Sequence, residues 1–439
     1  MIWSRYNRII KSSVGTGYIL FNSMSQTLLE IDNENIEAFR FLENNPDSYE
    51  EFENSQFLIE AKIIVENDDD LLSHHIDTIL KNRYNPNDIS LTIAVTRDCN
   101  FSCAYCYETE RPALYLSEKT EDDILAFLKS KKQLRSVFVA WYGGEPLLNF
   151  KCIQRLTNKI KNLGVQYAAM IVTNGYLLTE SVRNQLKDLS IYKIQVTLDG
   201  PKHIHDKRRN RKDGKGTYDR IISNLKELVV SYPELQIDIR TNIDKSIESE
   251  YTKFYKELKT IFGSNNVKPY AGFASDMMNT GCVSLDNSFH TNADKANFYI
   301  QNHNSNVDIN SYMPQRHITT CIANSMTGLV IGPEGEVYKC WLVIGMPEFI
   351  IGNIAEPEKF DVIKLAKYTC SADYIFDNKC RECFFLPVCS GGCPLARILN
   401  KEQNRNIETC YMIKDYLQQY LEFHIELMNN PEKDNYVLE

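Results

Sequence analysis

Apolar and polar positions along residues 89–273 follow two alternating patterns. Short runs that alternate apolar and polar residues, or that are rich in branched side chains, predict six strands, at 90–96, 136–142, 168–173, 193–198, 236–242 and 268–273. Amphipathic segments between them predict helices, near residues 120–132, 150–163, 179–189, 217–231 and 249–262. Thr120 and Asp123 are expected to form a capping box at the start of the first helix. Strict alternation predicts a parallel α/β sheet, and because six strands are too few for an eight-stranded barrel, we expect a partial (β/α)6, TIM-like barrel with its chemistry on the loops after the strands.

The chain on either side of this pattern is less regular. Residues 1–86 predict a small α+β unit, with strands at 18–22 and 61–65 and helices at 33–42 and 68–81. Asn85-Pro86-Asn87 is a turn signal and a plausible domain boundary. The loop-rich region from 321 to 410 is flanked by predicted helices near 290–302 and at 411–428. We therefore expect three domains, at 1–86, 87–300 and 301–439.

Composition narrows the class of protein. The 439 residues are 43% hydrophobic and 24% charged, as in ordinary soluble globular proteins. The net charge of -9 lacks the basic footprint of a general nucleic-acid binder. No run approaches the roughly 18 apolar residues of a membrane span, and the N-terminus has no uninterrupted apolar segment of a signal peptide. We expect a cytoplasmic protein with neither nucleic acid nor membrane as a partner.

The 13 cysteines point to metal or redox chemistry, because thiols in the cytosol are kept reduced. Cys99, Cys103 and Cys106 follow the first predicted barrel strand with a spacing that chance would produce only about 0.01 times in this chain. Three thiolates on one loop can hold a cubic iron-sulfur cluster and leave one iron without a protein ligand. A structural zinc would need a fourth ligand, which neither Asp98 nor Glu108 obviously supplies.

This spacing, with Tyr105 just before the last cysteine, resembles the signature of the radical S-adenosylmethionine (radical SAM) superfamily. The resemblance implies a 4Fe-4S cluster whose free iron binds S-adenosylmethionine, and a 5'-deoxyadenosyl radical that abstracts hydrogen from a substrate. Gly143-Gly144-Glu145 is similar to the family's GGE segment, although a Gly-Gly pair alone is only a turn. His205 we interpret as a structural histidine. The cofactor contacts implied by the resemblance are Tyr105, Gly143, Gly144, Glu145, Thr197, Asp199, Arg209 and Arg240.

A second group of cysteines lies in the C-terminal region, at Cys321, Cys340, Cys380, Cys383, Cys389, Cys393 and Cys410. Their spacing resembles the SPASM domain of radical SAM enzymes that act on peptides and proteins, with a pair of zinc ribbons as the alternative. The resemblance implies an outer auxiliary cluster on Cys380, Cys383, Cys389 and Cys410 and an inner one on Cys321, Cys340 and Cys393. The chain would then hold three 4Fe-4S clusters. The inner set is one ligand short, so either Cys282 or Cys370 completes it or an iron stays open for a substrate thiolate. Cys152 is expected to be a buried apolar residue.

The residue after Cys340 bears on the substrate. Anaerobic sulfatase maturases resemble this chain but carry an aspartate base at that position, where this chain has Trp341. The difference favours the maturases of ribosomal peptides, which install thioether or carbon-carbon crosslinks in a precursor peptide. Residues 1–86 resemble their winged-helix modules, which bind a leader sequence, although this unit could instead only cap the barrel. The sequence identifies no catalytic acid or base. The resemblance to radical SAM enzymes implies a reducing partner such as flavodoxin or ferredoxin. Sulfatase-maturase-like protein modification and a non-catalytic zinc-binding interaction protein remain the alternatives.

Overall fold

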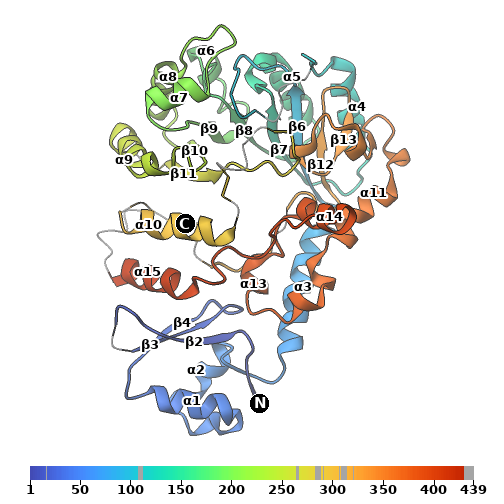
Figure 1. The fold of residues 1–439 in the computed structure, drawn as a ribbon. Helices are drawn as coiled ribbons and strands as arrows, with labels where there is room; N and C mark the ends of the chain where they lie inside the picture. Colours follow the sequence, from blue (N-terminus) through green and yellow to red (C-terminus); the bar gives the residue numbers. More distant parts are fainter. Residues whose placement is uncertain are drawn as a thin grey trace. The chain divides into compact units, whose positions relative to one another are not determined.

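The computed structural model describes nine stretches of the chain, at residues 1–15, 17–106, 112–263, 266–281, 288–289, 291–305, 307, 314–319 and 321–429. The chain forms two compact units (Figure 1). The larger contains Tyr84–His290 and Ile322–Ser371, and the smaller contains Met1–Arg83, Thr291–Cys321 and Ala372–Glu439. These two units do not coincide with the three domains predicted from the sequence. The functional boundaries of those domains remain a prediction.

A single sheet organises the larger unit. Its strand order is β11-β10-β9-β8-β7-β6-β12-β13-β14. The first six are parallel, and they are β6 (Asp88–Thr96), β7 (Ser136–Gly143), β8 (Gln166–Thr173), β9 (Ile191–Thr197), β10 (Gln236–Ile243) and β11 (Val267–Phe273). Each strand end falls within two residues of the sequence prediction. The partial α/β barrel is therefore confirmed.

Three short strands that the sequence reading did not anticipate extend this sheet. They are β12 (Gly328–Ile331), β13 (Glu336–Tyr338) and β14 (Gly352–Asn353). Strand β12 pairs in parallel with β6, and β13 and β14 follow in antiparallel pairs. The four residues of β12 are all buried, so part of the region predicted to be loop-rich completes the barrel sheet.

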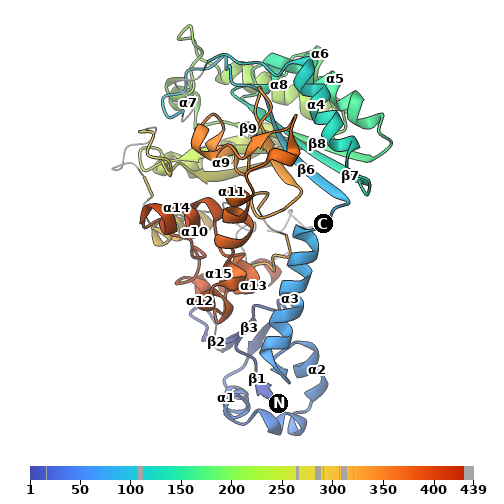
Figure 2. The same cartoon turned by 90° about the vertical axis from the view of Figure 1, so that its right-hand side faces the viewer.

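Helices follow the barrel strands and cover one face of the sheet (Figure 2). They are α4 (Glu118–Lys129), α5 (Phe150–Lys161), α6 (Glu180–Arg183), α7 (Lys202–Arg208), α8 (Tyr218–Ser231) and α9 (Tyr251–Phe262), and a further short helix, α11 (Val362–Ala366), lies in the C-terminal part of this unit. The predicted capping box was wrong, because Ser117 caps α4 by accepting a hydrogen bond from the backbone of Thr120 at 3.1 Å. The helix expected at 179–189 is limited to α6.

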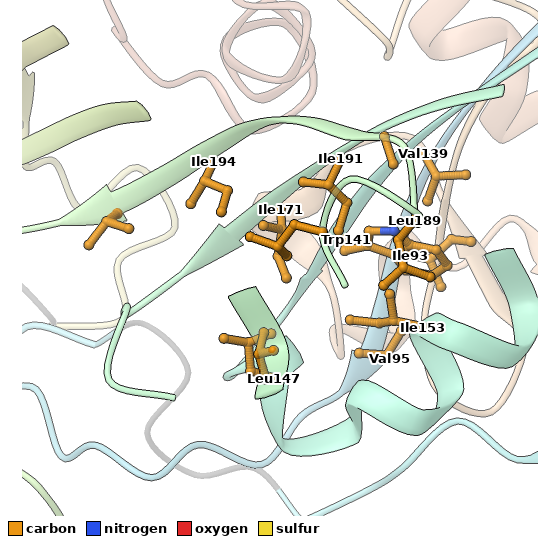
Figure 3. Close-up of a cluster of buried hydrophobic side chains, with 14 of the residues drawn as sticks. Ile93, Val95, Val139, Trp141, Leu147, Ile153, Ile171, Leu189, Ile191 and Ile194 are labelled. Atoms are coloured by element: carbon orange, nitrogen blue, oxygen red, sulfur yellow. The ribbon is translucent and has the colours of Figure 1, made fainter. Parts of the chain in front are cut away.

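The core of the larger unit lies between the sheet and these helices. Figure 3 shows the apolar side chains that strands β6 to β9 send toward α5 and its neighbours, among them Ile93, Val139 and Ile171. Trp141 lies among them and is fully buried. The motif residues lie at the carboxyl ends of these strands and on the loops that follow them.

The smaller unit begins with two sheets. Strand β1 (Ile2–Trp3) pairs with β5 (Ile64–Val65), and β2 (Asn7–Lys11), β3 (Tyr18–Asn22) and β4 (Leu28–Ile31) form an antiparallel sheet. Helices α1 (Ile36–Asn44), α2 (Ser55–Glu60) and α3 (Asp68–Arg83) complete this part. The strand predicted at 18–22 is confirmed, whereas that at 61–65 is reduced to β5.

The C-terminal part of the smaller unit is built of short helices. They are α10 (Asn292–His303), α12 (Asn378–Arg381), α13 (Leu386–Cys389), α14 (Pro394–Gln403) and α15 (Leu417–Asn429), the last starting six residues later than predicted. A buried ion pair of 2.5 Å between Arg83 and Asp373 joins the end of α3 to this part. No helix in the described stretches combines the length and apolarity needed to cross a lipid bilayer.

Candidate functional site

The first cysteine loop leaves the carboxyl end of β6 and is held by the segment that follows α7. Ser102 donates its backbone N–H to the carbonyl of Asn210 at 2.8 Å, and Ala104 donates to that of Arg208 at 3.0 Å. Phe101 forms an isolated bridge with Arg211. Because these contacts are between backbones, the loop is fixed independently of its own cysteine side chains.

Gly143 and Gly144 bring the end of β7 against the start of this loop. A Cβ on Gly143, whose φ is +131°, would lie 2.1 Å from the carbonyl oxygen of Thr96, and one on Gly144 would lie 2.3 Å from that of Asp98. The close approach allows two backbone hydrogen bonds. The N–H of Gly144 donates to the carbonyl of Thr96 at 3.0 Å, and the N–H of Glu145 donates to the carbonyl of Asp98 at 2.8 Å. The glycines thus have a role within the chain, in addition to the cofactor contact that the sequence led us to expect.

Glu145 is fully buried and joins the ends of β7 and β8. Its Oε1 accepts from the backbone of Leu147 at 3.0 Å and from the hydroxyl of Thr173 at 2.7 Å, and its Oε2 accepts from the backbone of Asn174 at 2.7 Å. Burial raises the pKa of this carboxyl, while the hydrogen bonds act to lower it. A carboxylate has about four acceptor positions, so one remains for a further donor.

Tyr105 is the centre of a hydrogen-bond network across the strand ends. Its hydroxyl donates to Asp199 and accepts from Arg209 at 2.5 Å and from the side-chain amide of Asn242 at 3.0 Å. Asp199 is fully buried and also accepts from the backbone of Asn242 at 3.0 Å. The structure therefore brings together three of the predicted site residues, Tyr105, Asp199 and Arg209.

Thr197 and Arg240 lie side by side at the same end of the sheet, as register partners on β9 and β10. Thr197 is buried, and Arg240 donates to the side chain of Asn242 at 2.8 Å, so Arg240 reaches Tyr105 only through that asparagine. Asn242 was missed in the sequence, although its place at the end of a predicted strand was a usable signal.

Arg208 was also missed. Its guanidinium lies 4.9 Å from the ring centre of Tyr105 and donates to Asp244 at 2.7 Å. The sequence singled out Arg209 in the adjacent Arg208-Arg209 pair, and only the structure shows that both side chains approach the same tyrosine.

His205 has the structural role expected of it. The backbone N–H of Asp199 donates to its Nδ1 at 3.2 Å, which leaves Nε2 to carry the proton and donate to Thr217 at 3.0 Å. Thr217 in turn donates to the carbonyl of Arg209 at 2.7 Å. Burial, followed by the charges of Arg209 and Arg208, lowers the pKa of His205. The ring is neutral and holds the Asp199–Arg209 segment in place.

Burial disfavours the free thiolate forms of Cys99 and Cys103. Burial, then the nearby Glu145, Cys103 and Cys106, raise the pKa of Cys99 to about 12. Burial also raises the pKa of Cys103, although Arg209 opposes it. Buried thiols of this kind lose their protons only to a positive partner, and three thiolates on one loop are a donor set that fits an iron-sulfur cluster.

The predicted outer set of C-terminal cysteines lies together in the smaller unit. Burial raises the pKa of Cys389 to about 11, and Cys380, Cys383 and Cys410 are close enough to contribute to this shift. Four thiols are a donor set that would suit a second iron-sulfur cluster. No three His, Cys, Asp or Glu side chains in the described part of the chain form a site for a single metal ion.

The cysteines of the predicted inner set are distributed over both units. Cys321 and Cys393 belong to the smaller unit and Cys340 to the larger, so the inner set stays a prediction. Cys370 is exposed, and Cys282 lies outside the described residues. Cys152 is fully buried on α5, as predicted.

Trp341 lies in the larger unit beside the end of β7. Its ring stacks on that of Tyr142, with 6.1 Å between centroids and 19° between planes. Half of the Trp341 residue surface remains exposed. Tyr142 directly precedes Gly143, so this aromatic pair borders the candidate site.

Comparison with known proteins agrees with this geometry. Residues 93–238 match the model of the Radical SAM superfamily. The serine-type anaerobic sulfatase-maturating enzyme of Bacteroides thetaiotaomicron is 24% identical over 365 residues, which are 73% of this chain and 86% of that protein. The radical SAM cyclopropyl synthase TigE of Paramaledivibacter caminithermalis is 25% identical over 439 residues, covering 90% and 89% of the two chains.

Solved structures share the fold. Native anSMEcpe with bound AdoMet has a TM-score of 0.58 at 19% identity, covering 79% of this chain and 99% of that one. Streptococcus suis SuiB bound to precursor peptide SuiA has a TM-score of 0.54 at 16% identity, covering 94% and 99%. A non-catalytic zinc-binding protein is therefore the wrong alternative. Residues 93–238 thus form a Radical SAM domain, and over most of its length the chain is similar to an anaerobic sulfatase-maturating enzyme and to a radical SAM cyclopropyl synthase.

Proposed function

We propose that this enzyme is a peptide maturase that forms a crosslink within a ribosomal precursor peptide, a thioether first and a carbon-carbon bond as the second choice. The observation that carries this proposal is Trp341 at the border of the site, stacked on Tyr142 and half exposed. Sulfatase maturases resemble this chain but have an aspartate base after the corresponding cysteine. An indole ring has no proton acceptor, so Trp341 cannot serve as that base.

The chemistry of the described residues supports an assignment of the groups that would hold the cofactors. We assign Cys99, Cys103 and Cys106 to the first 4Fe-4S cluster. When bound, this cluster and S-adenosylmethionine would supply a 5'-deoxyadenosyl radical that abstracts hydrogen from the peptide. The protein's own part is to place the cofactor and to keep its surroundings fixed.

Two groups of the site have hydrogen-bonding capacity left for the methionyl end of the cofactor. Glu145 has one acceptor position, which we assign to the ammonium group. The Nε of Arg209 is buried and makes no hydrogen bond within the described chain, so we assign it to the carboxylate. Thr197 and Asp199 are assigned to the nucleoside, and Arg240 supports Asn242 behind them.

Two auxiliary clusters complete the proposal. Cys389 and the three cysteines that contribute to its pKa shift, Cys380, Cys383 and Cys410, would hold the outer cluster. Cys321, Cys340 and Cys393 would hold the inner one, with its fourth position open to the thiolate of the peptide. The enzyme would work in the cytoplasm with a low-potential partner such as flavodoxin or ferredoxin.

The first 86 residues are proposed to bind the leader of the precursor. The sheet order β2-β3-β4 leaves β2 and β4 as edge strands within this unit. A leader could add a strand at such an edge. SuiB, which shares the fold, is known bound to a precursor peptide. Deletion of residues 1–86 should weaken precursor binding, and unchanged affinity would favour a simple cap.

The test begins with the cofactors. Anaerobically purified protein should contain about twelve irons for its three four-iron clusters and should release 5'-deoxyadenosine with dithionite. Cys103→Ala should abolish this release and keep the C-terminal iron. Continued release from Cys103→Ala would contradict the assignment.

The product test uses a short cysteine-containing peptide, to be sought among the reading frames that neighbour the gene. Incubation should remove two hydrogens from the peptide, as detected by mass spectrometry. Trp341→Ala should reduce this modification while 5'-deoxyadenosine still forms, and Trp341→Phe should retain more of it. Cofactor cleavage without any change in the peptide would refute the crosslinking proposal.

Sulfatase maturation is the second candidate, favoured by the 24% identity to the maturase from Bacteroides thetaiotaomicron. A peptide with a sulfatase-type serine or cysteine site serves as the competing substrate. We expect no oxidation of that residue, because Trp341 replaces the base.

A further inference from the structure

Arg397 contacts the outer group of cysteines directly. Its Nη2 donates a hydrogen bond to the Sγ of Cys380 at 3.0 Å. Arg397 lies on α14, which begins immediately after Cys393. The following inference concerns the outer auxiliary cluster, so it rests on the proposed function.

Two other acceptors fix the guanidinium in this position. Its Nε donates to the carbonyl of Gly391 at 2.6 Å, and its Nη1 donates to Asp377 at 3.2 Å. The side chain of Arg397 is only 17% exposed. Because three acceptors occupy the planar fork, its orientation toward the sulfur does not depend on Cys380 alone.

Both supporting acceptors are themselves held by the fold. Asp377 caps α12 by accepting from the backbone of Lys379 at 2.9 Å. Gly391 has φ of +72°, and a Cβ there would lie 2.1 Å from the ring of Tyr374. Glycine thus lets the chain pass beneath that ring and present its carbonyl to Arg397.

We propose that Arg397 raises the reduction potential of the outer auxiliary cluster, as a positioning residue that acts through the sulfur of Cys380. Hydrogen bonds to the ligand sulfurs are among the factors that set the potential of an iron-sulfur cluster. A donor that carries a full positive charge stabilises the more negative, reduced form. The outer cluster is therefore easier to reduce than it would be beside a neutral side chain.

The potential itself provides the test. The measurement uses protein with Cys99→Ala, Cys103→Ala and Cys106→Ala, which removes the first cluster, in a redox titration followed by electron paramagnetic resonance. The signal that disappears in Cys380→Ala identifies the outer cluster. Arg397→Gln should shift the midpoint of this signal to a lower potential.

Two further variants separate the hydrogen bond from charge in general. Arg397→Lys keeps the charge but not the planar fork, and it should give a smaller shift in the same direction. Lys401→Gln removes an exposed charge from the same helix, four residues further along, and should leave the midpoint unchanged. An unchanged midpoint in Arg397→Gln, with iron content equal to that of the parent, overturns the proposal.

If the Arg397→Gln variant loses the outer cluster, the role of Arg397 is tested in the parent protein, where the side chain is unchanged. Parent protein labelled with 15N-arginine should show hyperfine coupling between a guanidinium nitrogen and the reduced outer cluster, and absence of coupling overturns the role of Arg397. Absence of iron from the triple-cysteine variant would instead overturn the cluster assignment made in the proposed function.

Discussion

Gly144→Ala should remove the first cluster without a change to any cysteine. The new methyl group would lie 2.3 Å from the carbonyl oxygen of Asp98 and 2.8 Å from that of Arg97. These are backbone atoms immediately before Cys99, so the contact cannot be relieved by a side-chain rotation. The hydrogen bonds from Gly144 to Thr96 and from Glu145 to Asp98 would be lost or stretched.

The cost follows from these contacts. Two neutral hydrogen bonds contribute about 1 kcal/mol each, and overpacking of a tight site costs about 1–3 kcal/mol. The substitution therefore destabilises the native arrangement of the strand ends by about 3–5 kcal/mol, which is enough to displace the cysteine loop. Purified variant should lose about four of the roughly twelve irons that the three proposed clusters would hold, and it should not cleave S-adenosylmethionine.

Gly164→Ala is the matched control. That glycine also lies in the larger unit, and a Cβ there meets nothing within 4 Å. Its φ of +74° limits the cost to roughly 1–2 kcal/mol of backbone strain, so iron and cofactor cleavage should stay at the level of the unsubstituted enzyme. Full iron content and normal cleavage in Gly144→Ala would refute the reasoning.

Two further predictions concern the stability of the smaller unit. Asp373→Ala leaves the buried guanidinium of Arg83 without its carboxylate and should lower the free energy of unfolding by about 3–5 kcal/mol, whereas Glu43→Ala in an exposed pair should cost less than about 1 kcal/mol. Denaturant unfolding measures both, and equal effects would contradict the role of burial. Burial, then Arg316 and His317, lower the pKa of His75 from 6.5 to about 4. The unfolded chain therefore binds the proton first, and stability should fall by up to about 3 kcal/mol as pH drops from 6.5 toward 4. His75→Gln should flatten this dependence while His74→Gln, at an exposed neighbouring position, should not, and the same pH profile in both variants would disprove the assignment.

The pattern of apolar and polar residues was sufficient to predict the barrel, because each strand and helix there has its own hydrophobic periodicity. The six parallel strands, and the helices near 150–163 and 217–231, could be located from alternation and amphipathicity alone. The segment at 328–331 was harder, since it is short, fully buried and paired with β6 far away in the sequence. Such a strand is defined by its partner rather than by its own residues.

The residues of the candidate site show the same difference between local sequence pattern and long-range contacts. The sequence by itself was enough to predict a radical SAM domain, because the spacing of Cys99, Cys103 and Cys106 is a local property of one loop. Tertiary structure decided which other groups meet there. Arg208 and Asn242 join Tyr105 only because α7 and β10 end at the same edge of the sheet.

The C-terminal region makes the physical reason plain. Cysteine spacing predicted a cluster-binding segment, yet nothing in that spacing indicated that Arg397 would reach the sulfur of Cys380. A motif whose residues are close together in the sequence can be recognised from the sequence pattern alone. Contacts between residues distant in sequence depend on how whole elements pack, and for this enzyme only the folded chain reveals them.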